Sequence, residues 1–386
     1  MSLLFVMMPE THATSSTVGT STTSSVFKYS FQRHGFYANG LFWIFYSDGT
    51  NLVYRTTRDG GSWSAARTIR SSNLGYLDPI WFDGKHAHRV HTCDTTGFTV
   101  TYQRGTPNSD SSITWSPLQI ILPAGGTYYP AFITVDTGGY PWIIYRRSDG
   151  SGTYPFVIKS STNDGTWVNA TGFPQQLSTT SADWSVEIVP LRVRKVLAIY
   201  ALGGIAIRAR VWNGSAWGRE TATTSSPRSG IYQSAVAEGD TVHLVFLESK
   251  SHDIIHTRYA YSNNSWNTGS TVAHSASPAS SPQLSMNLVN GSLLLSVFWL
   301  EAKSMWNESH ASHLGLVRSV RPQICYDSSA RGIWTGTRCK ITDVNGGSGL
   351  SAFYLGFAGR IAVFYVVSRG SAYDVKCMFL APGEDP

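Results

Sequence analysis

The sequence contains little charge and no long apolar or helical run. Asp, Glu, Lys and Arg together make up 14% of the 386 residues. We find no run with the 3.6-residue apolar periodicity of an amphipathic helix, which excludes a helical fold. The apolar residues 2–8 are too few to cross a bilayer and lack the basic start of a signal peptide, so no transmembrane segment is predicted.

Positive charge is in modest excess but is dispersed along the chain. The formal net charge is +6, and the arginines occur as separated pairs, such as Arg67 with Arg70 and Arg192 with Arg194. Binding to nucleic acid requires a compact basic stripe, which the chain lacks. We therefore predict no nucleic-acid partner.

Cysteine is scarce, and the four cysteines lack the closely paired spacing of structural zinc ligands. Cys325 and Cys339 are 14 positions apart and are predicted to form a disulfide. Cys93 and Cys377 each lie in a strand-like run, and whether they pair stays open.

Three closely spaced histidines, His86, His88 and His91, invite comparison with a metal site. On a strand, His86 and His88 share one face, while His91 points to the other. Two ligands do not make a zinc site, and a third would have to come from a neighbouring part of the fold. We therefore predict no metal site and no cofactor.

Features of an exported protein are present. Five N-x-Ser/Thr sequons occur, at Asn169, Asn213, Asn263, Asn290 and Asn307. Residues 11–25 are mostly Ser, Thr, Gly and Ala, a composition typical of a linker or an O-glycosylated stretch. Together with the low charge, these features favour a secreted or cell-surface location.

An internal repeat organises the chain. Tryptophans that follow small polar turns occur at Trp63, Trp115, Trp167, Trp217, Trp266 and Trp334, with spacings of 52, 52, 50, 49 and 68 residues. Four nearly equal gaps indicate one structural unit per period. The last gap is longer because an insertion near residues 303–312 separates two strands.

Each period predicts four short antiparallel strands. In the third period, strands are expected at residues 128–135, 142–146 and 156–160, and Trp167 is expected to open the fourth. Gly, Asn and Asp lie between the runs, as tight hairpin turns require. Four-stranded units repeated around a closed ring form a β-propeller.

The sequence therefore predicts an all-β propeller with seven blades, or six as the alternative. Six periods end in Trp, and residues 350–380 supply three further strands. A strand near residues 25–31 is expected to complete that last blade and close the ring. In this division residues 1–25 are an apolar end and a Ser/Thr-rich linker, and residues 26–386 form one propeller domain.

The turn before each Trp resembles the Asp-box of sialidases and related propellers, Ser/Thr-x-Asp-x-Gly-x-Thr-Trp. Residues 57–63 read Thr-Arg-Asp-Gly-Gly-Ser-Trp and residues 161–167 read Ser-Thr-Asn-Asp-Gly-Thr-Trp. Each copy is one residue shorter than the family form. The predicted structural residues of these turns are Asp59, Trp63, Asp164, Trp167, Trp217 and Trp266. In that family the box is a fold element remote from the ligand site, so the resemblance implies a propeller and not an activity.

Sialidases bind the substrate carboxylate with three arginines and use a Tyr activated by a Glu, with an Asp as acid/base. Arg33, in the segment Phe-Gln-Arg-His-Gly, is similar in position to the first of these arginines, although the Ile-Pro that follows it in the family is missing. Arg146 and Arg228 are candidates for the other two, but both occur in turn-like segments.

The starts of the innermost strands line the central funnel of a propeller, and candidate site residues are placed there. Glu187 is the candidate catalytic carboxylate, with Asp78 as its partner and Arg33 beside them. Two carboxylates at a defined separation are required for glycoside hydrolysis, and loop capping or pairing with arginine is the alternative role for both. Candidate ligand contacts are Trp184, Tyr129, Tyr232 and Gln233.

The leading interpretation is a surface-displayed or extracellular binding module for a glycan or a protein partner on the funnel face. Aromatic and amide side chains suit saccharide stacking and hydroxyl recognition. The alternatives are a sialidase-like glycoside hydrolase, and a structural component of a surface layer, filament or virion. The oligomeric state stays open.

Overall fold

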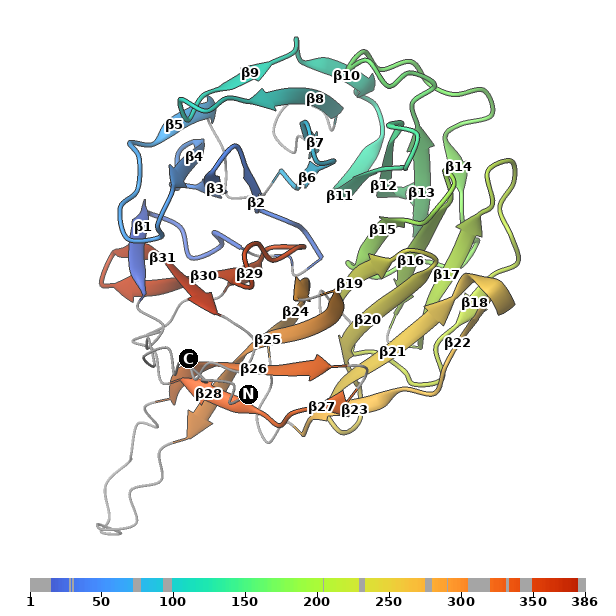
Figure 1. Ribbon diagram of the computed structural model, residues 1–386. Coiled ribbons are helices and arrows are strands. Elements are labelled where there is room, and N and C mark those ends of the chain that lie inside the picture. Colours follow the sequence, from blue (N-terminus) through green and yellow to red (C-terminus); the bar gives the residue numbers. More distant parts are fainter. Residues whose placement is uncertain are drawn as a thin grey trace, which may run out of the picture.

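The fold was obtained as a computed structural model that describes residues 15–27, 29, 31–71, 78–92, 99–203, 205–228, 233–274, 280–289, 291–304, 320–330, 333–340 and 349–380. Seven antiparallel sheets stand around a central axis, which confirms the predicted seven-bladed propeller (Figure 1). The described residues contain a single short helix, the 3₁₀ turn η1 (Tyr261–Asn263). None of the helices described could span a membrane.

Every sheet has a path of four hydrogen-bonded strands, ordered from the axis outwards, and the second, fifth and sixth sheets have a fifth strand as well. The first contains β2 (Gly35–Ala38), β3 (Leu41–Ser47), β4 (Leu52–Thr57) and β5 (Arg67–Arg70). The second contains β6 (Ile80–Phe82), β7 (Ala87–Thr92), β8 (Val100–Pro107) and β10 (Gln119–Leu122), with β9 (Ile113–Trp115) also paired to β8. The third contains β11 (Thr127–Val135), β12 (Pro141–Ser148), β13 (Thr153–Lys159) and β14 (Gln175–Gln176).

The remaining sheets repeat this order. The fourth contains β15 (Val186–Pro190), β16 (Val196–Leu202), β17 (Ala206–Trp212) and β18 (Thr221–Ala222). The fifth contains β19 (Gln233–Glu238), β20 (Thr241–Leu247), β21 (Ile254–Ala260) and β22 (Ser265–Trp266), with β23 (Ser270–Ala273) beside β21. The sixth contains β24 (Ser280–Val289), β25 (Ser292–Ser304), β26 (Val320–Ala330) and β27 (Ile333–Trp334), with β28 (Arg338–Lys340) beside β26.

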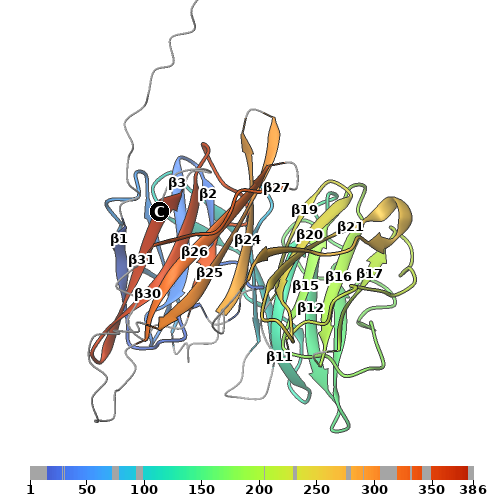
Figure 2. The ribbon, with the colours of Figure 1, turned by 90° about the horizontal axis from the view of Figure 1, so that it is seen from below.

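The seventh sheet closes the ring with strands from both ends of the described chain. It contains β29 (Leu350–Ala352), β30 (Ile361–Arg369), β31 (Ala372–Leu380) and, as its outermost strand, β1 (Ser16–Ser21). The register of β1 on β31 runs from Ser16 opposite Cys377 to Ser21 opposite Tyr373. Figure 2 shows β1 beside β31 at one side of the ring.

The predicted position of the closing strand was wrong by about ten residues. β1 lies inside the segment that was predicted to be a linker. The prediction failed because an outermost strand buries few side chains and because the Ser/Thr-rich composition of β1 is also typical of a linker. In β1 only Val18 and Ser21 are buried. The described residues of the expected strand at residues 25–31 form no strand: Val26 and Phe27 pack against the seventh sheet, and Phe31 lies in the core shared by later blades.

The predicted start of the fourth strand was also wrong in the third blade. Trp167 precedes β14 by several residues and lies in the loop after β13. Its ring packs 5.1 Å from that of Tyr102 in the neighbouring sheet, and its indole N–H donates to Asn169 Oδ1. Trp167 therefore packs between blades and does not open a strand. Trp266 and Trp334, in contrast, lie in β22 and β27, the outermost strands of their sheets, as the repeat predicts.

The turns before these tryptophans are held by side-chain caps. Asp59 Oδ1 accepts hydrogen bonds from the backbone N–H groups of Gly61 and Ser62, at 2.9 and 3.0 Å. These bonds lower the pKa of Asp59, although its carboxylate is exposed. Asp164 Oδ1 likewise accepts from the N–H of Thr166. Gly60 has a φ of +80°, a left-handed conformation that other residues seldom adopt.

The predicted disulfide is present and joins β26 to β28 through Cys325 and Cys339. Cys377 is a free, buried thiol, and Cys93 lies outside the described residues. Three sequon asparagines, Asn169, Asn213 and Asn263, are exposed. Asn290 and Asn307 lie outside the described residues.

Ring closure by β1 leads to a test. Val18→Ala removes two buried methyl groups and is expected to lower the free energy of unfolding by about 2 kcal/mol. Thr20→Ala, on the exposed face of the same strand, is expected to change it by less than about 0.5 kcal/mol. Urea denaturation measures both, and equal stabilities of the two variants would contradict the assignment of β1.

Candidate functional site

The innermost strands β2, β6, β11, β15, β19, β24 and β29 converge around the axis (Figure 1). We call the side on which these strands begin the strand-start face, and the other side, where each turns into the next strand, the hairpin face. Radial convergence of parallel strands brings residues far apart in sequence to one place. The candidate residues from the sequence are therefore distributed around one axis.

The structure brings Arg33 and Glu187 together beside the axis. Arg33 precedes β2, Glu187 is on β15, and both side chains are fully buried. Both bind the backbone of Ala235 on β19: its N–H donates to Glu187 Oε2 at 2.8 Å, and its carbonyl accepts from Arg33 Nη2 at 2.9 Å. Arg33 Nη2 also donates to Ser234 Oγ at 3.0 Å. Three blades are tied together by this pair.

Burial sets the charges of the pair. Burial raises the pKa of Glu187 to about 7, although the attraction of Arg33 and hydrogen bonds from Ala235 and Gln233 oppose this rise. Burial also lowers the pKa of Arg33, against the attraction of Glu187 and Tyr354. Among the described residues, Nε and Nη1 of Arg33 have no hydrogen-bond partner. A carboxylic acid that titrates near neutrality thus lies beside a guanidinium group with spare donors.

Asp78, the predicted partner of Glu187, has its own set of partners. Its carboxylate accepts hydrogen bonds from Arg89 Nη1 at 2.5 Å, from His91 Nδ1 at 2.7 Å and from Arg70 Nη2 at 3.4 Å. Burial favours the neutral acid, but His91, Arg89 and Arg70 together hold the pKa of Asp78 well below its usual range. Asp78 is thus the anionic centre of a buried ion cluster.

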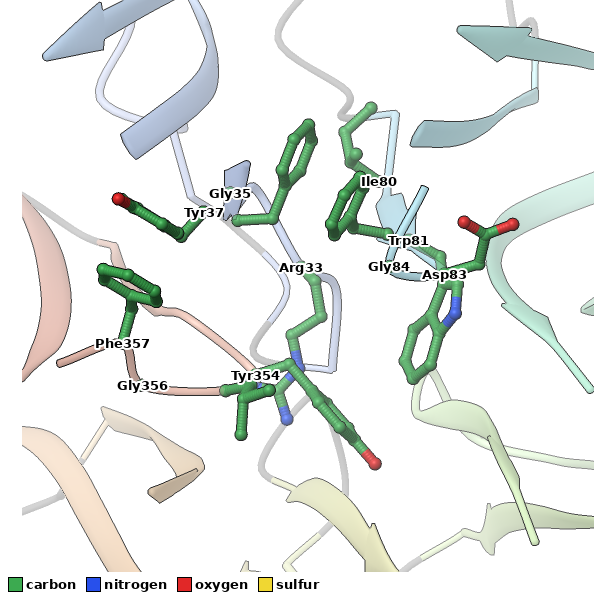
Figure 3. A pocket seen from close by; sticks show the side chains of 13 residues that line it. Arg33, Gly35, Tyr37, Ile80, Trp81, Asp83, Gly84, Tyr354, Gly356 and Phe357 are labelled. Atoms are coloured by element: carbon green, nitrogen blue, oxygen red, sulfur yellow. The ribbon is translucent and has the colours of Figure 1, made fainter. Parts of the chain in front are cut away.

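A pocket of about 340 Å³ lies beside Arg33 (Figure 3). Its walls are mostly aromatic and come from β2, β6 and the segment after β29. Tyr37 stacks on Phe357, with ring centroids 3.3 Å apart, and the Arg33 guanidinium lies 5.3 Å from the ring centroid of Tyr354. The side chain of Arg33 runs towards Tyr354 in the middle of the view. The pocket can hold a small apolar or aromatic group with a polar end beside Arg33.

A second arrangement forms around Trp184. The Arg146 guanidinium lies 4.7 Å from the ring centroid of Tyr129 and 4.5 Å from that of Trp184. Tyr29 stacks on Trp184 at 6.5 Å with an interplanar angle of 14°. Burial lowers the pKa of Arg146 to about 10, opposed by the attraction of Asp183, so the group stays cationic. Trp184 remains 42% exposed, which makes it a fixed aromatic surface at the strand-start face.

Sequence reasoning identified Trp184 and Tyr129 but misplaced the residue between them. Arg146 ends the strand expected at residues 142–146 but was described as turn-like when it was considered as a site residue, whereas it lies within β12 and is buried. The signal was its place in the expected strand, because β12 is buried continuously from Pro141 to Arg146. Gln233, also predicted, is buried at the start of β19 and hydrogen bonds to Glu187. Tyr232 lies outside the described residues.

Comparison with known proteins supports the fold. No protein-family profile matches the chain. No curated protein matches it either. Among solved structures, AofleA from Arthrobotrys oligospora has a TM-score of 0.50 at 9% identity, covering 86% of this chain and 91% of its own.

Sialidases also occur among the structural neighbours. The Hadza microbial sialidase Hz136 has a TM-score of 0.48 at 11% identity, covering 86% of this chain and 74% of its own. The Trypanosoma rangeli sialidase has a TM-score of 0.45 at 12% identity, covering 83% of this chain and 56% of its own. Such identities are informative about the fold alone, and the assignment of the turns to the Asp-box stays a prediction.

The Glu187 environment leads to a pH-dependent test. Because the pKa of this carboxyl rises from 4.5 in the unfolded chain to about 7 in the fold, its contribution to stability is complete below pH 4.5 and is lost as the pH rises through 7. Glu187→Gln is expected to remove this fall. Urea denaturation between pH 4.5 and pH 7 measures the free energy of unfolding of the wild type and the variant.

Asp59→Asn is the control for this comparison, because the pKa of Asp59 is lowered and its carboxyl therefore titrates below the range from pH 4.5 to 7. It is expected to keep the fall in stability between pH 4.5 and 7. Parallel stability curves for the wild type and Glu187→Gln would contradict the perturbed titration of Glu187.

Proposed function

We propose that this propeller is an extracellular or surface-displayed binding module that recognises a glycan at its strand-start face. The observation that carries the proposal is Trp184, a large aromatic side chain left 42% exposed while Arg146, Tyr129 and Tyr29 fix its position. An apolar ring face that is rigid before binding costs little conformational entropy when a sugar stacks on it.

The surroundings of Trp184 supply polar groups for a saccharide. Asp183 directly precedes it and uses Oδ1 to accept the backbone N–H of Trp184 at 2.7 Å. The cation of Arg146 lies beneath the indole, and the nearby loop at residues 178–181 carries exposed Ser and Thr side chains. Hydroxyl, carboxylate and aromatic groups together match the mixed apolar and polar faces of a hexose.

An extracellular location is supported by the covalent structure. The disulfide between Cys325 and Cys339 is typical of oxidising compartments. The exposed sequon asparagines Asn169, Asn213 and Asn263 are accessible acceptors for N-linked glycans. A protein ligand on the same face is the other partner that fits an exposed aromatic anchor.

A sialidase-like glycoside hydrolase is the second candidate, and Glu187 is the observation in its favour. A buried carboxyl with a pKa of about 7 suits a general acid at neutral pH, and Arg33 beside it suits an anionic substrate. The mechanism requires a second carboxylate facing the same bond. Asp78 would serve that role only by giving up its bonds to Arg89 and His91, which ranks this candidate below binding.

The test of the binding proposal is a glycan array that includes neutral and sialylated structures. Trp184→Ala is expected to weaken binding about 10- to 30-fold, the effect of losing a central aromatic contact worth roughly 2 kcal/mol. Phe357→Ala is the matched control, because Phe357 is 40% exposed but lies at the aromatic pocket. The control is expected to bind like the wild type.

The outcomes separate the candidates. Binding lost in Phe357→Ala and retained in Trp184→Ala would overturn the proposal and move the ligand to the pocket beside Arg33. Hydrolysis of fluorogenic glycosides that disappears in Glu187→Gln would establish the hydrolase instead. An absence of both binding and hydrolysis would favour a structural role in a surface layer, filament or virion.

A further inference from the structure

Three potential metal ligands meet at the hairpin between β6 and β7, at the hairpin face of the second blade. Asp83 follows β6, His86 precedes β7, and His88 is on β7. One oxygen of Asp83 and one ring nitrogen of each histidine lie within 4.8 Å of one another. The third ligand that the sequence interpretation lacked is thus supplied by the same hairpin.

The distances between these atoms suit one small cation. Asp83 Oδ2 lies 3.0 Å from His88 Nε2 and 3.6 Å from His86 Nδ1. Ligands about 2.0–2.1 Å from a tetrahedral zinc ion are about 3.3–3.4 Å apart. The two measured separations lie on either side of that value, so small side-chain movements would complete the geometry.

Outer contacts orient the ligand atoms as they do in metal sites. His88 Nδ1 is 2.8 Å from the Tyr102 hydroxyl, which fixes the ring with Nε2 towards Asp83. Asp83 Oδ1 is occupied by the backbone N–H groups of Lys85 and His86, at 2.8 and 2.6 Å, which leaves Oδ2 for a ligand. A histidine whose far nitrogen is held in this way is the usual arrangement around zinc.

We propose that Asp83, His86 and His88 bind a divalent transition-metal ion, with Zn²⁺ the best match to two imidazoles and one carboxylate. This donor set suits first-row metals with nitrogen preference and disfavours Mg²⁺ and Ca²⁺, which take oxygen ligands. Three protein ligands leave a fourth position for water or for a group from a partner.

The site is open to solvent on one side. The side chains of His86 and Asp83 are 16% and 19% exposed, whereas that of His88 is 2% exposed. The Asp83 carboxylate points away from Arg33 in Figure 3, so the metal would lie outside the aromatic pocket although Asp83 contributes to its wall. Metal binding at this hairpin is therefore independent of the ligand proposed at Trp184.

Two neighbouring cations, Arg104 and Lys85, oppose the proposal, and Lys85 acts on His86 from within the same hairpin. Arg104 on β8 is close enough to act electrostatically on both imidazoles. Its guanidinium is engaged by the carbonyls of Asn163 and Asp164 in the loop of the next blade. Asp83 contributes a single negative charge. With a divalent metal ion bound, the net charge around the site is therefore positive, which favours an anionic fourth ligand.

The test uses full-length protein stripped of metal with a chelator and titrated with ZnCl₂ by calorimetry, and with CoCl₂ by absorption spectroscopy. We expect one ion per chain, visible Co²⁺ bands of low-symmetry coordination, and a rise in Tm with added Zn²⁺. His86→Ala is expected to weaken Zn²⁺ binding at least about 100-fold, and Tyr102→Phe about 10-fold, because outer partners alone contribute 10- to 100-fold.

His274→Ala is the matched control. His274 forms an imidazole–carboxylate pair with Asp253 at 3.0 Å, but its side chain is 84% exposed, and this pair belongs to neither three-ligand group found among the described residues. It is expected to bind Zn²⁺ like the wild type. Absence of saturable binding in the wild type, or unchanged affinity in a folded His86→Ala, would overturn the proposal.

Discussion

The pairing of β1 with β31 is the constraint on which the rest of the structure depends. Without it, β31 would present an unpaired edge, and the seventh blade would have three strands from one end of the chain alone. Closure fixes the angular position of every blade, and therefore the convergence of the inner strands at the axis. Between β1 and β2, Phe27 packs in the core of the first and seventh sheets and Phe31 in that of the second to fourth, so the segment after the closing strand joins the cores of several blades.

The centre of the ring is a structural region that also carries charge. Arg33 and Glu187 join three blades through the backbone of Ala235, and leaving a buried hydrogen-bonding group of this kind without its partner typically costs about 1–3 kcal/mol. A rigid centre holds the neighbouring surfaces in place: Trp184 on the strand-start face, and the aromatic pocket beside Arg33. The proposed ligand and the proposed metal thus use different parts of one rigid ring, and neither requires the buried pair to separate.

Much of the fold could be predicted from the sequence because its signals are local. The Trp spacing gave the period, and alternating apolar residues with Gly and Asn turns gave the strands of each blade. The weakest predictions concerned strands that bury little. β1 contains one buried apolar residue, Val18, and β14 is two residues long, so neither has the alternation that marks a strand.

The sequence by itself determined the repeat, and it predicted a ring of seven blades, with six as the alternative, and the disulfide between Cys325 and Cys339, because each depends on periodicity or on covalent chemistry. Only the tertiary structure decided which residues meet. Arg146 lies between Tyr129 and Trp184, and Asp83 lies within reach of His86 and His88, because strand register and hairpin geometry place them there. Register is a property of paired strands, so a spacing along the chain does not specify which side chains converge.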